Sequence, residues 1–120
     1  MIQSVEAKSA VALAVPVTNT IRKVTDAGWY DKSMDRSDLH AMQTPQSFEY
    51  KLIKMAFDNM KADVAGPEMT DDVMVLEKYG DARSFFIPGS FENIKVTTPE
   101  DLLLAEAILD RREKAKDKKV

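Results

Sequence analysis

The chain has 120 residues, 44% of them hydrophobic and 31% charged, with a net charge of −3, which fits one domain with a buried core. The acidic balance excludes a basic surface for nucleic acid, and the absence of cysteine beside a single histidine, His40, excludes disulfides and thiolate or histidine metal clusters. Because no apolar run reaches the roughly 20 residues of a membrane span and no signal peptide is visible, we expect a soluble, cytoplasmic protein.

The first predicted strand covers residues 9–17, a nearly continuous apolar run that is typical of a strand buried on both faces. Residues 1–8 suit the last turns of a helix, so we expect the chain to begin part-way through a larger fold. Residues 18–35 predict a hairpin, because two charged strand-like runs flank a glycine-containing turn. This hairpin offers little apolar surface, so we expect a projecting arm, either exposed to solvent or docked against a partner chain.

Two helices are predicted in the middle of the chain. Pro45 disfavours a helix before it, and from there an apolar face recurs at helical spacing, formed by Phe48, Leu52, Met55, Ala56 and Met60. After a turn at residues 65–68, Asp71 and Asp72 open a second helix that runs to about Tyr79. The helix dipole explains paired aspartates at a helix start, and a cation site is the alternative explanation.

The C-terminal part predicts a strand over residues 83–89, followed by Lys95 on a short apolar strand and then a helix. The start of that helix is signalled by Thr98, Pro99 and Asp101. Ligands of open α/β sheets collect at the carboxyl ends of strands, so Lys95 there would meet a phosphate; an ordinary edge-strand lysine is the alternative. We expect the helix to cover the sheet with its apolar face and residues 111–120 to fray as a charged tail.

The chain has neither a glycine-rich phosphate loop nor a serine triad, because its four glycines are isolated and no serine lies in a nucleophile elbow. What remains is a set of cations and hydroxyls at predicted element boundaries: Thr20, Arg36, Thr44, Thr70 and Lys95. This set suits a phosphorylated polyol, because arginine binds phosphate through two hydrogen bonds and lysine offsets charge near a reacting phosphoryl group. Taken singly, each residue is better explained as a surface or capping residue.

Five motifs occur in order: Pro-Val-Thr-Asn-Thr at 16–20, Asp-Arg at 35–36, Gln-Thr-Pro-Gln-Ser-Phe at 43–48, Thr-Asp-Asp at 70–72, and Asn-Ile-Lys-Val-Thr-Thr-Pro-Glu-Asp-Leu at 93–102. Together, over residues 9–109, they resemble the C-terminal half of the 2-C-methyl-D-erythritol 4-phosphate cytidylyltransferase family. That family of the non-mevalonate isoprenoid pathway joins CTP to a sugar-alcohol phosphate and releases pyrophosphate. Ribitol-5-phosphate cytidylyltransferase shares much of the pattern, and the ending at 97–102 favours the erythritol enzyme.

The resemblance implies an α/β fold, namely the C-terminal half of a Rossmann-like nucleotidyltransferase with residues 18–35 as the β-hairpin arm of a homodimer. It implies that Thr20 and Arg36 bind methylerythritol phosphate in the partner's site, with Arg36 positioning it for attack. It also implies that Lys95 holds the same phosphate and orients its oxygen toward the α-phosphorus of CTP. Arg36 and Lys95 are thus the expected catalytic residues, and Thr44 and Thr70 are secondary substrate-binding residues.

The sequence also departs from the family pattern. Residues 1–120 lack the glycine-rich nucleotide loop of the resembled family, so CTP and the Mg²⁺ that the family needs would lose their sites. Asn19 stands where many relatives carry aspartate. We therefore expect a partial nucleotidyltransferase domain over 1–120 that does not turn over CTP alone. A non-catalytic dimerisation module derived from the family is the alternative.

Overall fold

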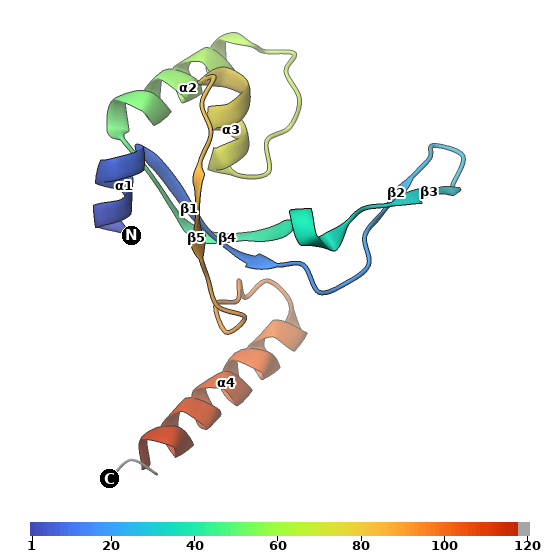
Figure 1. The fold of residues 1–120 in the computed structure, drawn as a ribbon, viewed down its shortest axis with the longest axis vertical. Coiled ribbons are helices and arrows are strands. Elements are labelled where there is room, and N and C mark those ends of the chain that lie inside the picture. Colours follow the sequence, from blue (N-terminus) through green and yellow to red (C-terminus); the bar gives the residue numbers. More distant parts are fainter. Residues whose placement is uncertain (118–120) are drawn as a thin grey trace. The chain divides into compact units, whose positions relative to one another are not determined.

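In a computed structural model, residues 1–117 are described, and the chain divides after Gly89 into two compact units. The first unit contains all the described strands and the first helices: α1 (Ile2–Lys8), β1 (Ala10–Pro16), β2 (Arg22–Val24), β3 (Tyr30–Ser33), a 3-10 helix (Arg36–Asp38), β4 (His40–Phe48), α2 (Tyr50–Ala62), α3 (Asp72–Tyr79) and β5 (Phe85–Pro88). Figure 1 labels each of them except the 3-10 helix. The second unit contains α4 (Pro99–Asp117). None of the described helices has the length and apolar character that crossing a bilayer requires.

Strand β1 is the centre of a three-stranded sheet of order β4-β1-β5. It runs antiparallel to β4 and parallel to β5. Ala10, Val11 and Ala12 are at most 1% exposed, which confirms the predicted buried strand. Its apolar run forms a strand here because both edges are paired and both faces are removed from water. The sheet and its helices give the mixed α/β fold that the sequence predicts.

The core of the first unit lies where α2 and α3 pack beside the start of β1. Its centre consists of the buried residues Ala10, Ala56, Val75 and Leu76. Partly buried apolar side chains surround it, among them Phe48, Leu52 and Met60 of the predicted helical face. Met55 was placed wrongly on that face, since it is 46% exposed. It directly precedes Ala56, so the helical rotation of about 100° per residue turns it toward solvent.

The predicted hairpin is confirmed as the antiparallel pair β2–β3, with Arg22 opposite Ser33 and Val24 opposite Tyr30. At its turn, the N–H of Gly28 donates to the carbonyl of Thr25 at 2.9 Å, and Gly28 has φ 90°, a left-handed conformation that favours glycine. Residues 21–33 are all exposed. Figure 1 shows this ribbon projecting from the three-stranded sheet, as expected for an arm.

Strand β4 was not predicted, although Pro45 correctly disfavours a helix in this stretch. The structure accommodates the proline in an irregularity of the ladder. Ala12 pairs with Gln46 and Ala14 with Met42, so the intervening residues of β4 bulge out of register. A proline has no N–H to donate, and a bulge is one of the few places in a sheet where none is needed.

The predicted strand around Lys95 was wrong. Residues 93–97 are irregular, and the N–H of Ile94 donates to the carbonyl of Glu92 at 3.1 Å. A strand requires a neighbouring strand to satisfy its backbone groups, and none of the strands in residues 1–117 pairs with this segment. The apolar residues beside Lys95 therefore do not form a strand by themselves.

The predicted start of α4 is confirmed, with Pro99 as its first residue. The expected fraying of residues 111–117 was wrong, because they continue the helix; residues 118–120 of the expected tail lie outside the described part of the chain. Lysines in the last turn favour the helix through its dipole. Ile108 of the predicted apolar face is buried, whereas Leu102, Leu104 and Leu109 are 58%, 49% and 57% exposed.

Candidate functional site

Arg36 and Thr20 lie at the base of the arm. The guanidinium of Arg36 donates from Nη1 to the carbonyl of Thr18 at 2.6 Å, which ties the two ends of the arm together. The N–H of Met34 also donates to the carbonyl of Ile21 at 2.8 Å. Thr20 follows Thr18 by two residues and is exposed. The structure therefore brings two of the predicted phosphate-binding residues to one end of the arm.

A local turn presents the Arg36 side chain. The carboxylate of Asp35 accepts hydrogen bonds from the hydroxyl of Ser37 at 2.8 Å and from its N–H at 3.0 Å. These bonds, the hydroxyl first, hold the pKa of Asp35 below its ordinary value. A guanidinium has five N–H donors, and Thr18 accepts from one nitrogen, so the planar fork can still bind an oxyanion.

The second pair of predicted residues, Thr44 and Thr70, is connected by a residue that the sequence analysis missed. Gln46 donates from Nε2 to Asp71 Oδ2 at 3.1 Å, and its Oε1 accepts from the N–H of Val73 at 3.3 Å. Gln46 thus joins β4, which carries Thr44, to the start of α3, which follows Thr70. The Gln-Thr-Pro-Gln motif includes Gln46, but the fold places it beside the buried strand β1, where its amide needs hydrogen-bond partners.

Asp71 caps α3, and both of its carboxylate oxygens accept hydrogen bonds. Its Oδ1 accepts from the N–H of Met74 at 2.8 Å, and its Oδ2 accepts from Gln46. Across residues 1–117, no group of three or more histidine, cysteine, aspartate or glutamate side chains is placed to hold a metal ion. The described residues therefore offer no ready-made cluster of ligands for the Mg²⁺ that the family resemblance implies.

Lys95 belongs to the second unit, in the irregular segment that leads into α4. It is exposed and lies two residues before Thr97, where the helix cap begins. Asp101 Oδ2 accepts from the N–H of Thr97 at 3.0 Å and of Thr98 at 2.9 Å, while the hydroxyl of Thr98 accepts from the N–H of Asp101 at 3.3 Å. This reciprocal cap fixes the segment two residues after Lys95.

The Asp101 cap predicts a pH dependence. Hydrogen bonds from the backbone N–H of Thr97, and then of Thr98, hold the pKa of Asp101 below its ordinary value of 3.8. A carboxyl whose pKa is lower in the folded state stabilises that state above its unfolded pKa, and the stabilisation is lost as the pH falls through the folded pKa. We expect the amides of Thr97 and Thr98 to lose hydrogen-exchange protection below about pH 4. An Asp101→Asn variant should lack this step; its persistence there would contradict the prediction.

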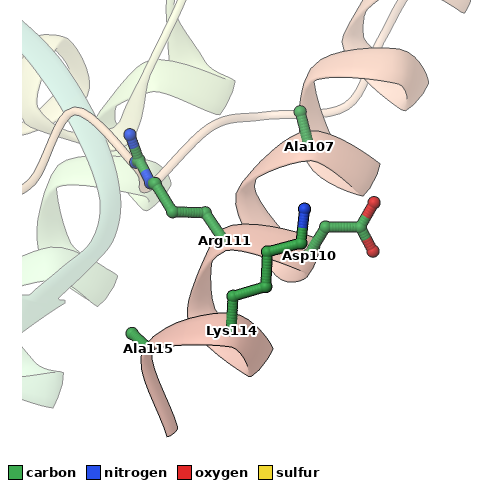
Figure 2. A pocket seen from close by; sticks show the side chains of 5 residues that line it. All are labelled: Ala107, Asp110, Arg111, Lys114 and Ala115. Atoms are coloured by element: carbon green, nitrogen blue, oxygen red, sulfur yellow. The ribbon is translucent and has the colours of Figure 1, made fainter. Parts of the chain in front are cut away.

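A hollow of about 540 Å³ lies along α4. Figure 2 shows the side chains that line it, those of Ala107, Asp110, Arg111, Lys114 and Ala115. All five residues come from one helix, so this is the outer surface of α4 and no predicted site residue lines it. In Figure 2, the Arg111 side chain points away from those of Asp110 and Lys114, and it binds Glu92 Oε1 at 3.1 Å. Exposed ion pairs of this kind contribute little to stability.

Comparison with known proteins identifies the family. The model of the 2-C-methyl-D-erythritol 4-phosphate cytidylyltransferase family matches residues 1–111. The chain belongs to this family. The enzyme of that name from Lachnoclostridium phytofermentans is 40% identical over 91% of this chain and 46% of its own length. The enzyme of the same name from Clostridioides difficile is 45% identical over 86% of this chain and 42% of its own length.

Solved structures agree with the family assignment. The crystal structure of 4-diphosphocytidyl-2C-methyl-D-erythritol synthase from Anaerococcus prevotii matches with a TM-score of 0.82 and 30% identity, over 91% of this chain and 48% of that one. The cytidylyltransferase from Thermus thermophilus matches with a TM-score of 0.71 and 27% identity, over 90% of this chain and 52% of that one. The resemblance and fold class inferred from the sequence are thereby confirmed. The chain spans about half the length of the relatives that it matches.

Proposed function

We propose that this chain forms the acceptor-binding part of a 2-C-methyl-D-erythritol 4-phosphate cytidylyltransferase. Such an enzyme transfers CMP from CTP to 2-C-methyl-D-erythritol 4-phosphate. The main support is the family match over residues 1–111, which includes all five predicted site residues. The placement of Arg36 and Thr20 at one end of an exposed arm, both able to bind phosphate, is consistent with this proposal.

In the proposed reaction, an oxygen of the acceptor phosphate attacks the α-phosphorus of CTP. The bond from that phosphorus to the bridging oxygen breaks, and pyrophosphate leaves. The guanidinium of Arg36 binds the acceptor phosphate through its remaining N–H donors, and the ammonium of Lys95 binds the same group and orients the attacking oxygen. Thr20, Thr44 and Thr70 supply hydroxyl hydrogen bonds. Cationic partners also reduce the repulsion between the two anionic reactants.

We further propose that the arm docks against a second copy of the chain. Val24, Trp29 and Tyr30 are 65%, 76% and 79% exposed on a two-stranded ribbon, and such a ribbon is marginally stable alone. Burying these side chains in a homodimer would remove apolar surface from water. Arg36 and Thr20 at the arm base would then act in the partner's site. The cytoplasmic location inferred from the sequence stays a prediction.

The experiment is a titration of the purified chain with 2-C-methyl-D-erythritol 4-phosphate and with ribitol 5-phosphate, together with sedimentation. We expect binding of the erythritol phosphate, a dimer, and no turnover of added CTP, because residues 1–120 contain no glycine-rich phosphate loop. Binding of ribitol 5-phosphate alone would identify the other acceptor. A dimer that binds neither phosphate would show a non-catalytic dimerisation module instead.

A further inference from the structure

Gly89 ends the first unit at the point where the chain leaves β5. Its N–H donates to the carbonyl of Ala14 at 2.8 Å, so its backbone is held beside the carboxyl end of β1. Since β5 runs parallel to β1, this point lies at the carboxyl edge of the sheet. Ligands of open α/β sheets collect at that edge.

The side chain of Gln43 occupies the space beside Gly89. A Cβ atom added at residue 89 would collide with Gln43 Oε1, and would lie 3.2 Å from Gln43 Cδ and 3.1 Å from the carbonyl oxygen of Ala14. Gly89 does not have a positive φ, in contrast to Gly28. A Cβ at residue 89 would therefore displace the end of the Gln43 side chain and come close to the Ala14 carbonyl, although the backbone conformation of Gly89 is not left-handed.

The bulge in β4 carries Gln43 to this place. Ala12 pairs with Gln46 and Ala14 with Met42, so Gln43 lies in the stretch of β4 that bulges opposite Leu13. A bulge re-aims a side chain that regular pairing would direct elsewhere. The contact thus depends on both the irregular register of β4 and the absence of a side chain at Gly89.

We propose that Gly89 and Gln43 form one positioning pair, which we call the Gly89–Gln43 contact. Because residue 89 has no side chain, the side chain of Gln43 can pack against the end of β5. This packing holds Gly89 in place, and the segment that carries Lys95 begins at Gly89. Lys95 follows Gly89 by six residues, so its backbone can lie at most about 20 Å from Gly89. Holding Gly89 in place therefore restricts the positions that the Lys95 ammonium can reach. The effect on phosphate binding rests on the proposed function, whereas the contact itself does not.

The test is a double-mutant cycle with Gly89→Ala, Gln43→Ala and the combined variant. Amide hydrogen exchange of Gly89 reports its bond to Ala14, and a titration with 2-C-methyl-D-erythritol 4-phosphate reports the effect on binding. We expect each single variant to raise the exchange rate of Gly89 about tenfold and to weaken binding by a similar factor. The combined variant should be no worse than either single one, because all three break the same contact.

Gly66→Ala is the matched control. A Cβ there would also collide with side-chain oxygens, those of Tyr79 and Asp63, but in the connection between α2 and α3. It should leave the exchange of Gly89 unchanged. An unchanged rate in Gln43→Ala, or additive effects in the combined variant, would overturn the proposal.

Two further results also decide the question. If Gly89→Ala fails to fold, a combined variant that folds like Gln43→Ala supports the pair. A combined variant that also fails would overturn it, since the methyl group would then be excluded by the backbone of Ala14. If the unaltered chain binds no methylerythritol phosphate, the proposed function fails, while the exchange rates still test the Gly89–Gln43 contact.

Discussion

Replacing Arg36 with alanine is expected to weaken the binding of 2-C-methyl-D-erythritol 4-phosphate by about 1.5–3 kcal/mol for each charge-assisted hydrogen bond lost. That range corresponds to roughly tenfold to 150-fold in the dissociation constant for a single bond. Lysine at this position should restore part of the affinity, because it keeps the charge but lacks the planar fork. Isothermal titration of the whole chain measures both effects.

Arg22 provides a matched control for Arg36. It is also an exposed arginine on the arm, on β2, and is not among the residues placed in the phosphate site. We expect Arg22→Ala and Arg22→Lys to leave the affinity for the phosphate within about a factor of two, as for surface changes away from a site. Equal losses for the two arginines would indicate a general effect of arm charge and would contradict a specific role of Arg36.

Arg36 also binds the backbone of Thr18, so a structural role must be separated from phosphate binding. Arg36→Gln keeps a donor for the Thr18 carbonyl and removes the charge. If Arg36 acts on the phosphate, this variant should retain hydrogen-exchange protection of Met34, whose N–H bonds to Ile21 at the arm base, and still lose affinity. Loss of protection at Met34 together with the affinity would indicate that Arg36 supports only the arm.

Leu76→Ala is expected to destabilise the first unit by about 2–5 kcal/mol. Leu76 is 0% exposed in the core between α2 and α3, beside Ala56, which is also 0% exposed. Deleting its side chain removes apolar burial and leaves a cavity whose walls relax incompletely. The loss is a large share of the roughly 5–15 kcal/mol by which a domain is stable. Denaturant unfolding followed by circular dichroism measures it.

Glu77→Ala is the control for Leu76→Ala. Glu77 is the next residue of α3 and is exposed, so its replacement should change stability by no more than about 0.5 kcal/mol. Similar losses for the two variants would show that α3 is sensitive through its helical propensity and that the core at Leu76 is not packed as the structure indicates.

Several features of the fold could be predicted because their signals are local. The apolar run of β1, the hairpin with its turn at Gly28 and the cap of α4 at Asp101 each involve residues within a few positions of one another. The five motifs were enough to identify the family, because their order along the chain can be read directly from the sequence. The candidate residues Thr20, Arg36, Thr44, Thr70 and Lys95 came from that same order and remain predictions.

The tertiary structure decided what depends on distant partners. β4 is a strand because β1 lies beside it, although Pro45 argues against one, and residues 93–97 are irregular because no described strand pairs with them. Gln46 was missed because its partners, Asp71 and Val73, are separated from it by all of α2. Hydrogen bonds across such separations follow from the folded path of the chain. The sequence by itself thus determined the family, the local elements and the candidate residues, while the pairing of strands and the partners of buried amides required the assembled fold.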